Sequence, residues 1–413
     1  MSKLQGLIKE LCPDGVEFRK LGEVCEFING FAFKSSLFKD EGLPIIRITN
    51  INGVSIDLSD VKFFDSRDYK SNLQSFSVSF GDILIAMSGA TTGKIGYYDN
   101  EDIAYLNQRV GKFVPNVNVL NNRYLFHFLL SKTSELYIMA GGGAQPNLSS
   151  NKLMNELYIP LPPLEIQNEI VRILDTFTSH TAELQAELQA RKEQYEYYRN
   201  KLLTFDENDE GVKWMKLGDL FDFKNGLNKG KEFFGKGSPI VNFTDVYNKR
   251  ALYKETLKGK VEVDLKETLR YNVHKGDVFF TRTSETPNDI GMSSVMMDEV
   301  ENCVFSGFVL RGRPRTQLLL PKYCAYCFST NQVRKEIVRN SSYTTRALTS
   351  GTNLSKISIP VPPLSEQKRI ISILDKFESL VNDLSEGLPA EIAAVQEQYE
   401  YYRNKLLTFK RKS

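Results

Sequence analysis

The chain has 413 residues, of which 41% are apolar and 25% charged, and its formal net charge is +2 at pH 7. This length exceeds what one hydrophobic core accommodates, so we expect two globular domains with connectors. No apolar run follows the first lysine and no stretch has membrane-spanning length, which argues against a signal peptide and a membrane protein. Five cysteines, an odd number, favour reduced thiols and hence a cytoplasmic location.

Basic residues are concentrated in the second half of the chain. Residues 1–155 contain 16 Lys and Arg against 16 Asp and Glu, whereas residues 211–355 contain 23 against 15. A basic domain is compatible with nucleic-acid binding, but an ordinary solvated surface explains this much charge about equally well. Charge alone therefore leaves the function open.

The first half begins with a mixed α/β segment. Short runs of β-forming residues predict strands over 44–51, 81–88 and 109–114. A helical pattern follows over 121–140, and then a polar, glycine-rich loop over 141–147. We expect a small α/β domain with polar loops after its strands.

A long amphipathic helix is predicted after Pro162 and Pro163, because proline is tolerated in the first turn of a helix. Its later apolar positions alternate at spacings of four and three, which is the pattern of a coiled-coil seam, here interrupted by one arginine. These positions are Leu184, Leu188, Arg191, Tyr195, Tyr198, Leu202 and Phe205. A helix over 178–205 would span about 42 Å.

The second half repeats this order after an acidic, apolar-free linker at 206–211. Strands are predicted over 238–246, 276–284 and 305–310, a helical stretch over 321–340, and a polar loop over 341–346. The second helical copy has seam positions at Leu388, Ile392, Val395, Tyr399, Tyr402, Leu406 and Phe409.

The two halves carry the same motifs. The run E-Q-Y-E-Y-Y-R-N-K-L-L-T-F occupies 193–205 and recurs at 397–409, and I-P-L-P-P-L at 159–164 returns as I-P-V-P-P-L at 359–364. Both halves also open with Gly-Val, Lys-Leu-Gly and Asn-Gly in the same order. One structural unit is therefore present twice, and its copies are expected to present the same surface to two equal partners or to each other.

The second helical copy has four extra residues between its matched blocks, and Gly387 and Pro389 lie there. We expect the helix to break at this point and to restart at Pro389. The two striped helices are expected to pack on each other, antiparallel because a whole domain connects them; the alternative is that each packs only on its own domain. The predicted fold class is α/β (α+β): two globular domains separated by two long antiparallel helices that form a coiled coil, with a pseudo-two-fold internal repeat.

The histidines and cysteines do not form a recognisable catalytic or metal site. His127, His180 and His274 lack the spacing of ligands or of a nucleophile's partner, so structural roles are favoured. Cys324 and Cys327 form a C-x-x-C pair, but zinc needs a second ligand pair, and the repeat aligns both with apolar helix positions. No paired catalytic residues and no methyltransferase motif are found.

The loop at 89–94 resembles a phosphate-binding P-loop. It has three residues between its glycines instead of four, and Ile95 replaces the magnesium-binding hydroxyl. The corresponding loop at 284–291 is aligned so that Asp289 takes the place of Lys94. Nucleotide binding is therefore rejected, while a loop of this composition suits contact with a polar, anionic surface.

Taken together, these motifs resemble the specificity subunit of type I restriction–modification enzymes. The resemblance rests on P-L-P-P-L-x-x-Q at 160–167, P-V-P-P-L-S-E-Q at 360–367, both Y-Y-R-N-K-L-L-T-F helices, and the opening L-C-P-D-G-V at 11–16. The repeated T-A-E-L, Q-A-E-L at 181–188 resembles a four-residue helical repeat of some members. The likeness covers nearly the whole chain, in the order variable, similar, variable, similar.

The resemblance implies four segments: target recognition domain 1 over 1–158, a central conserved helical region over 159–206, target recognition domain 2 over 207–358 and a C-terminal conserved helical region over 359–413. Each domain would read one half of a bipartite, asymmetric site in double-stranded DNA. The helices would dock two methyltransferase (modification) subunits, which recruit motor–nuclease (restriction) subunits. The chain itself would be non-catalytic and without a cofactor, since S-adenosylmethionine, ATP and Mg²⁺ belong to the partner subunits.

Candidate contact residues follow from the chemistry of base edges, which Arg, Asn, Gln, Ser and Thr side chains read, and of phosphates, which Lys contacts. In the first domain they are Arg47, Thr49, Asn50, Thr91, Thr92, Lys94, Asn107, Gln108, Arg109, Gln145 and Asn147. In the second domain they are Lys229, Lys231, Asn242, Thr244, Arg282, Thr283, Ser284, Thr344, Thr345 and Arg346. Partner docking is expected at Tyr197, Arg199, Tyr401 and Arg403, because the two tyrosines point away from the seam and tyrosine is favoured at interfaces.

Two other functions remain open at this point. The chain could be a nuclease or methyltransferase with a degenerate motif, or a non-catalytic protein-interaction scaffold without direct DNA readout. The absence of glycine-rich and N-P-P motifs argues against an enzyme. For a DNA reader, a helical spacer of about 40 Å is slightly longer than one turn of B-DNA, about 34 Å. Two readers at its ends could therefore contact one face of a duplex.

Overall fold

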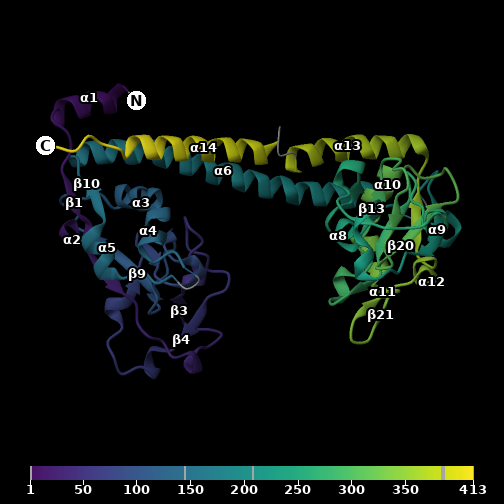
Figure 1. Ribbon diagram of the computed structural model, residues 1–413, viewed down its shortest axis with the longest axis horizontal. Coiled ribbons are helices and arrows are strands. Elements are labelled where there is room, and N and C mark those ends of the chain that lie inside the picture. The colour runs from purple at the N-terminus through teal and green to yellow at the C-terminus, as the bar shows by residue number, and fades with distance from the viewer. Residues whose placement is uncertain (1, 144–145, 207–208, 383–386, 413) are drawn as a thin grey trace. The chain divides into compact units, whose positions relative to one another are not determined.

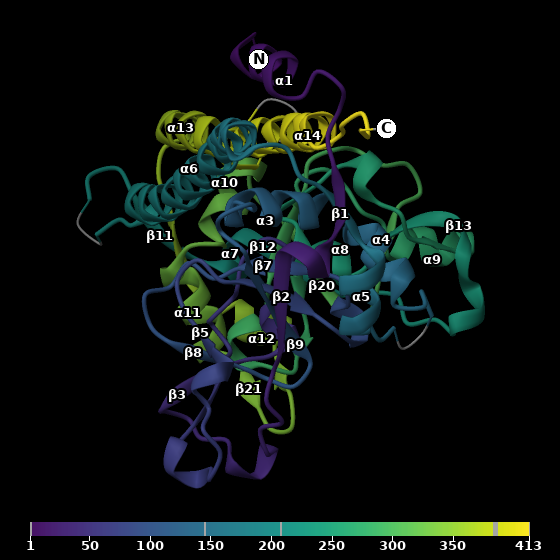
Figure 2. The same cartoon turned by 90° about the vertical axis from the view of Figure 1, so that its left-hand side faces the viewer.

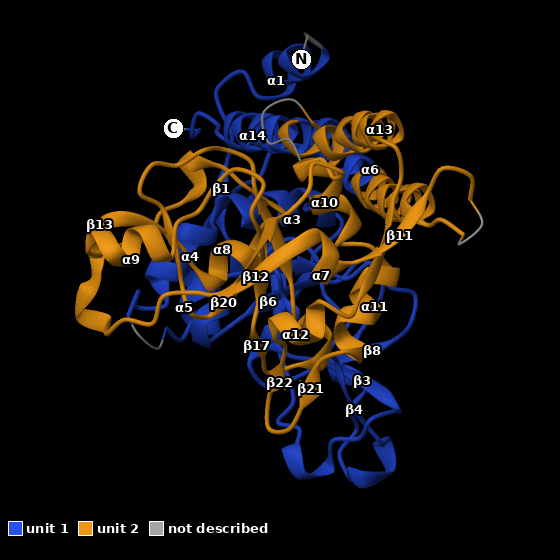
Figure 3. Ribbon diagram, turned by 90° about the vertical axis from the view of Figure 1, so that its right-hand side faces the viewer, with its two compact units in different colours: residues 1–185, 391–413 blue, residues 186–390 orange. Residues whose placement is uncertain are grey.

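The computed structural model describes residues 2–143, 146–206, 209–382 and 387–412. The chain forms two compact units: unit 1 consists of residues 1–185 and 391–413, and unit 2 of residues 186–390 (Figure 3). Each unit combines one α/β domain with parts of the long helices. The division into four segments cuts the chain differently and stays a prediction. None of the described helices is both long enough and apolar enough to span a membrane.

Unit 1 is built on two four-stranded sheets, ordered β2-β9-β6-β7 and β4-β3-β8-β5, beside the strand pair β1-β10 (Figures 1 and 2). Its strands are β1 (Phe18–Lys20), β2 (Cys25–Asn29), β3 (Leu43–Ile46), β4 (Lys62–Phe64), β5 (Ser77–Val78), β6 (Ile83–Ala86), β7 (Ile95–Tyr97), β8 (Ala104–Leu106), β9 (Val110–Pro115) and β10 (Tyr158–Pro160). Its helices are α1 (Ser2–Leu11), α2 (Leu21–Val24), α3 (Asn122–Ser131), α4 (Thr133–Met139), α5 (Ser150–Glu156), the first part of α6 (Leu164–Leu203) and most of α14 (Leu388–Leu406).

Unit 2 contains the five-stranded sheet β12-β20-β16-β18-β14, the three-stranded sheets β15-β13-β19 and β17-β22-β21, and the pair β11-β23. Its strands are β11 (Lys213–Lys216), β12 (Phe221–Asn225), β13 (Phe234–Val241), β14 (Ala251–Leu252), β15 (Lys260–Val261), β16 (Val278–Thr281), β17 (Thr283–Ser284), β18 (Ser293–Met296), β19 (Val304–Phe305), β20 (Val309–Pro314), β21 (Ser342–Tyr343), β22 (Ala347–Leu348) and β23 (Ser358–Val361). Its helices are α7 (Leu217–Leu220), α8 (Phe243–Asn248), α9 (Leu265–Arg270), α10 (Pro321–Cys327), α11 (Asn331–Arg339), α12 (Gly351–Leu354), α13 (Leu364–Asn382) and the second part of α6.

Short 3₁₀ turns connect these elements. They are η1 (Ser35–Leu37), η2 (Ile48–Asn50), η3 (Ser66–Asp68), η4 (Gln74–Phe76), η5 (Gly89–Thr91), η6 (Lys231–Phe233), η7 (Lys254–Thr256) and η8 (Pro287–Asp289). Two of them, η2 and η5, belong to the candidate site of unit 1.

The internal repeat extends through the two α/β domains, although their sequences match only in outline. The order β2-β9-β6-β7 in unit 1 corresponds to β12-β20-β16-β18 in unit 2. The anchoring of the following helix is also shared: the hydroxyl of Tyr124 donates to the carbonyl of Pro160 at 3.0 Å, and that of Tyr323 to Pro360 at 3.1 Å. The alignment that pairs these two tyrosines is therefore correct.

Four of the predicted strands differ from the expectation. The runs 276–284 and 305–310 are each divided, because β16 ends at Thr281 before β17, and β19 ends at Phe305 before β20. The run 44–51 is a strand only to Ile46 and then forms η2, and the run 238–246 turns helical at Phe243. The second turn has a local cause, because the backbone N–H of Asn242 donates to the carboxylate of Asp245 at 2.9 Å, as at a helix N-terminus. The helical stretches 121–140 and 321–340 each divide into two helices.

Each unit buries the thirteen-residue block that comes from the other half of the sequence. In unit 1, Leu406 and Leu407 lie in one apolar core with Ile166, Ile170 and Leu174 of α6. The block at 397–409 thus packs on the first domain. This burial is the main stabilising term that holds α14 in unit 1.

The reciprocal arrangement exists in unit 2. Tyr195 and Leu203, from the block at 193–205, share a core with Ile370 and Leu374 of α13. Each block also stacks one tyrosine ring on a phenylalanine ring of the neighbouring helix, with ring centroids 5.5 Å apart in unit 1 and 5.4 Å apart in unit 2. The stacked pairs are Phe177–Tyr402 and Tyr198–Phe377.

The long helices pack on each other within each unit, as expected, and on the α/β domain as well. In unit 1 the start of α6 and the end of α14 lie side by side and run in opposite directions (Figures 1 and 2). In unit 2 the end of α6 pairs with α13. The fold class predicted from the sequence is confirmed. The alternative, in which each helix packs only on its own domain, is wrong, because the end of α14 packs on the first domain and the end of α6 on the second.

The predicted helix break is also confirmed. Helix α13 ends at Asn382 and α14 begins at Leu388, with Pro389 in its first turn. Proline fits there because the first N–H groups of a helix have no intrahelical partner. Of the residues between these helices, 383–386 lie outside the described part of the chain.

The cysteines of the C-x-x-C pair are core residues. Cys324 and Cys327 are 3% and 0% exposed on α10. Burial raises the pKa of the Cys327 thiol to about 12, so it stays protonated. The favoured structural role of this pair is confirmed.

Candidate nucleic-acid interface

Four loops of unit 1 meet at the ends of strands β6 and β8. We call them loop cluster 1: residues 47–50, 88–92, 107–109 and 146–147. The hydroxyl of Thr91 donates to the carbonyl of Ile48 at 3.2 Å, and that of Thr92 to the carbonyl of Pro146 at 3.2 Å. The guanidinium of Arg109 donates to the hydroxyl of Ser88 at 3.0 Å. Segments far apart in the sequence thus form one surface.

Most residues predicted to contact DNA in the first domain belong to this cluster. Exposed members are Thr49, Gln108, Arg109 and Asn147, and half-buried members are Arg47, Thr91 and Asn107. Lys94 is half-buried just beyond the cluster, and Gln145 lies outside the described residues. Loop cluster 1 therefore presents Arg, Asn, Gln and Thr side chains, which can hydrogen-bond base edges.

Two predicted residues of this domain have structural roles. Asn50 is 3% exposed; its amide nitrogen donates to the carbonyls of Asp57 and Asp60 at 3.0 and 3.1 Å. Thr92 is 4% exposed and bonds within the cluster. Both residues shape the loops, and their contact with DNA stays an untested prediction.

The corresponding surface of unit 2, loop cluster 2, consists of residues 242–247, 282–286, 306–308 and 343–348. It surrounds a hollow of about 570 Å³ whose lining includes Thr283, Ser284 and Arg346 from the predicted set. The guanidinium of Arg282 donates to the carbonyl of Gly307 at 2.9 Å. Arg282 thus supports the turn 306–308, and its contact with DNA stays an untested prediction.

The other predicted residues of the second domain fall into two groups. Thr244, Thr344 and Thr345 are exposed within loop cluster 2, and Asn242 is half-buried at the start of α8. Lys229 and Lys231 lie apart: the ammonium of Lys229 pairs with Glu267, and Lys231 begins η6. These two lysines are not brought to the cluster by any described contact.

Large apolar side chains in loop cluster 2 were missed from the sequence. Phe308 is 66% exposed, Tyr343 58%, Leu348 42% and Tyr247 37%. A search limited to polar residue types could not find them. The repeat offered a signal, because the turn 306–308 aligns with 107–109, a predicted segment of the first domain.

The two clusters correspond at the strand ends from which their loops start. The backbone N–H of Met87 donates to the carbonyl of Arg109 at 2.9 Å, and that of Arg282 to the carbonyl of Phe308 at 3.2 Å. Phe308 thus occupies the place of Arg109. The same comparison corrects one predicted alignment. The backbone N–H of Ala86 donates to the carbonyl of Lys94, and that of Thr281 donates to the carbonyl of Met292. The counterpart of Lys94 is therefore Met292 and not Asp289. The three-residue error arose because the intervening loops differ in length.

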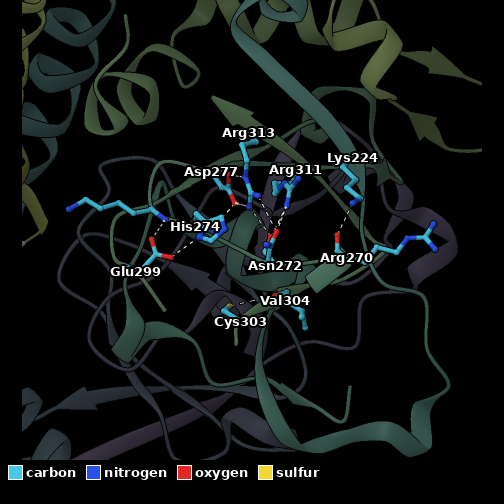
Figure 4. A network of polar contacts seen from close by, with 11 residues as sticks. Lys224, Arg270, Asn272, His274, Asp277, Glu299, Cys303, Val304, Arg311 and Arg313 are labelled. Carbon is cyan, nitrogen blue, oxygen red and sulfur yellow. Dashed lines mark hydrogen bonds and ion pairs between the residues drawn. The ribbon is translucent and has the colours of Figure 1, made fainter. Parts of the chain in front are cut away.

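A buried ion-pair network holds the opposite end of the same strands in unit 2 (Figure 4). Asp277, which precedes β16, is fully buried and receives two hydrogen bonds from Arg313, at 2.9 and 2.7 Å. Arg311 and Arg313 both donate to Asn272. In unit 1, Asp82 and Lys112 form the simpler equivalent at 3.0 Å. The antiparallel strands β16 and β20 therefore connect this anchor to loop cluster 2.

A second repeated surface lies on the helices. Tyr197 and Tyr401 are each 59% exposed, so both point away from the seam as predicted. Arg199 lies over the ring of Tyr195 at 5.6 Å, and Arg403 over that of Tyr399 at 5.2 Å. The two identical blocks thus adopt the same side-chain arrangement in different units, and each leaves one tyrosine ring in solvent.

The described residues contain no cluster of three or more His, Cys, Asp or Glu side chains suited to a metal ion. His127 is fully buried, with Nε2 2.8 Å from Asp175 and Nδ1 2.9 Å from the hydroxyl of Tyr399. His274 pairs with Glu299 at 2.7 Å on the surface. In the described part of the chain, these histidines serve structural contacts.

The architecture defines a class: a duplicated protein with two α/β domains, each joined to a helix pair and each displaying one polar loop cluster. A family model described as the type I restriction modification DNA specificity domain matches residues 13–194 and again residues 209–394. The chain belongs to this family.

Known proteins that are similar to this chain over most of its length agree with this assignment. A Haemophilus influenzae protein, described as a candidate type I restriction enzyme specificity subunit, is 31% identical over 95% of this chain and 96% of its own length. The specificity subunit of the Escherichia coli EcoR124I/EcoR124II type I restriction enzyme is 33% identical over 70% of each chain.

Solved structures support the fold. A chain from a study of complex assembly and conformational transition in the type I R-M system has a TM-score of 0.64 and 20% identity, and covers 96% of this chain and 98% of that one. A type I restriction–modification S subunit from M. genitalium has a TM-score of 0.50 at 15% identity, with coverage of 95% and 96%. At these identities the likeness concerns the fold.

Proposed function

We propose that this chain is the DNA sequence-specificity subunit of a type I restriction–modification complex. Loop cluster 1 reads one half of a bipartite, asymmetric site in double-stranded DNA, and loop cluster 2 reads the other half. The observation that carries the proposal is that the same loops gather in both units but carry different side chains. Two equivalent readers with different chemistry produce two unlike half-sites.

The repeated block on the helices is the proposed docking surface for two methyltransferase subunits. Tyr197 and Tyr401 are exposed to the same extent and sit in the same local arrangement. Rings that are 59% exposed contribute little to either core, whereas two copies of one partner would favour the same exposed tyrosine in both places. Motor–nuclease subunits would join through the methyltransferase subunits.

The chain is proposed to be non-catalytic. S-adenosylmethionine, ATP and Mg²⁺ would act on the partner subunits, and this chain would position them on DNA. The relatives named as specificity subunits support this division of labour. A protein scaffold without DNA readout is less well supported, since it gives no reason for two unlike loop clusters on one scaffold.

Sequencing of methylated adenines tests the proposal. A host lacking its own type I system would receive the cognate methyltransferase gene with or without this chain. Methylation at one gapped, asymmetric motif is expected only when both are present. Methylation without this chain, or at an ungapped motif, would contradict the proposal.

A further inference from the structure

Loop cluster 2 differs from loop cluster 1 in the kind of surface that it exposes. At equivalent positions, cluster 1 has Arg109 and Asn147, whereas cluster 2 has Phe308 and Leu348. The second equivalence rests on the backbone: the N–H of Leu148 donates to the carbonyl of Met87 as that of Thr349 donates to Arg282. Polar groups in one unit are thus replaced by apolar ones in the other.

Phe308 has no packing role that accounts for it. Two-thirds of the residue is exposed (66%), and it belongs to none of the apolar cores of unit 2. Its ring instead lines the hollow of about 570 Å³ together with Phe243 and Tyr247, which stack on each other at 5.7 Å. Large apolar groups exposed around one hollow are typical of a contact surface.

The polar lining of the same hollow disfavours a phosphate group. Glu285 and Asp289 both face it, and only Arg346 opposes them, with its guanidinium 3.9 Å from Glu285. Two carboxylates repel a phosphate, but they can accept hydrogen bonds from the amino groups of bases. The hollow therefore fits base edges better than the DNA backbone.

A base edge offers a single apolar group in the grooves of DNA, the C5 methyl of thymine in the major groove. Resting on the proposed function, we infer that Phe308 contacts a thymine methyl group. The half-site of unit 2 then contains at least one A·T pair at this contact, while Arg109 makes unit 1 read the equivalent position by hydrogen bonds. Phe308 is thus a specificity-determining residue of this chain.

The test uses the complete complex with its cognate methyltransferase subunits and the target found by methylation mapping. Each thymine of the target is replaced in turn by uracil, which lacks only the methyl group. One buried methyl contributes about fourfold in affinity. We expect a loss of about fourfold at one or two thymines of a single half-site with the wild-type chain, and none at these positions with Phe308→Ala or Phe308→Arg.

Leu265→Ala is the matched control, because Leu265 is 74% exposed on α9 and lies outside loop cluster 2. This variant should keep the uracil response. A target in which neither half-site contains a thymine would overturn the inference. So would a loss of affinity on uracil substitution that is the same in Phe308→Ala as in wild type. Weaker binding of Phe308→Ala without any uracil response would also overturn it, and would assign Phe308 to a wedge between bases or to a protein contact. In each of these cases a gapped methylated motif would still uphold the proposed function.

Discussion

The imidazole of His127 lies 2.9 Å from the hydroxyl of Tyr399, a residue 272 positions further along the chain. On its other side, Nε2 of His127 lies 2.8 Å from the carboxylate of Asp175. An ionised carboxylate only accepts, so Nε2 carries the proton and Nδ1 accepts from the tyrosine. This chain of hydrogen bonds joins α3, α6 and α14 within unit 1.

His127 should make unit 1 sensitive to mild acid. Burial lowers the pKa of His127 below the ordinary value of 6.5. The carboxylate of Asp175 opposes this effect, and the cations Arg123 and Arg403 add to it, so the pKa remains lowered. As the pH falls through 6.5, the unfolded chain takes up a proton that the folded chain resists, so the free energy of unfolding decreases. We expect the melting temperature of wild type to fall more between pH 7.5 and 5.5 than that of His127→Gln.

The matched control is His180→Gln, since His180 is a half-exposed histidine on α6, with 49% of its side chain accessible. It should leave the pH response unchanged. At pH 7.5, His127→Gln should be less stable by about 1–3 kcal/mol, because the half-buried Tyr399 loses the acceptor of its hydroxyl. Equal pH responses in wild type and His127→Gln would contradict the argument.

Each repeated block packs in the unit that contains the α/β domain of the other half of the sequence. We therefore predict that two equivalent leucines, one in each block, stabilise different units. Leu203 is 2% exposed in the core of unit 2, and Leu407, its repeat counterpart, is 7% exposed in the core of unit 1. Replacing either by alanine should cost about 2–5 kcal/mol. Hydrogen exchange read separately on α10 and α3 should show faster exchange in α10 for Leu203→Ala and in α3 for Leu407→Ala.

The contrary result would be destabilisation of the half in which each leucine lies in the sequence. That outcome would mean that each block packs in solution on its own half of the sequence. Leu269→Ala, at a position 65% exposed on α9, serves as the control that should change neither readout.

These leucines also show what the sequence could and could not predict. The break between α13 and α14 was predictable because Gly387 and Pro389 act locally on the backbone. The choice of unit by each block was not, because the thirteen residues are identical and only the tertiary connection decides which core receives them. Phe308 was missed for a different reason, since an exposed aromatic ring in a loop has no periodicity and only its three-dimensional neighbours mark it.

The continuity of α6 predicts how the spacing between half-sites can be changed. The helix is unbroken from Leu164 to Leu203 and passes the boundary between the units at residue 185. Duplicating residues 185–188 adds about 6 Å of helix, close to two base pairs. Methylation mapping should show a longer gap between two unchanged half-sites. An unchanged gap would refute the idea that this helix sets the spacing.

Loss of the exposed tyrosines should remove the methyltransferase subunits one at a time. Tyr197 and Tyr401 are equally exposed, so Tyr197→Glu and Tyr401→Glu should each leave a complex with one methyltransferase subunit, and the double variant none. A buried carboxylate without a partner disfavours the interface strongly, while the exposed positions leave folding intact. Light scattering of the co-purified complex gives the stoichiometry, and circular dichroism checks the fold. Tyr137→Glu, at a position 39% exposed on α4, should keep both subunits. Two subunits bound to the double variant would show that the partner docks elsewhere.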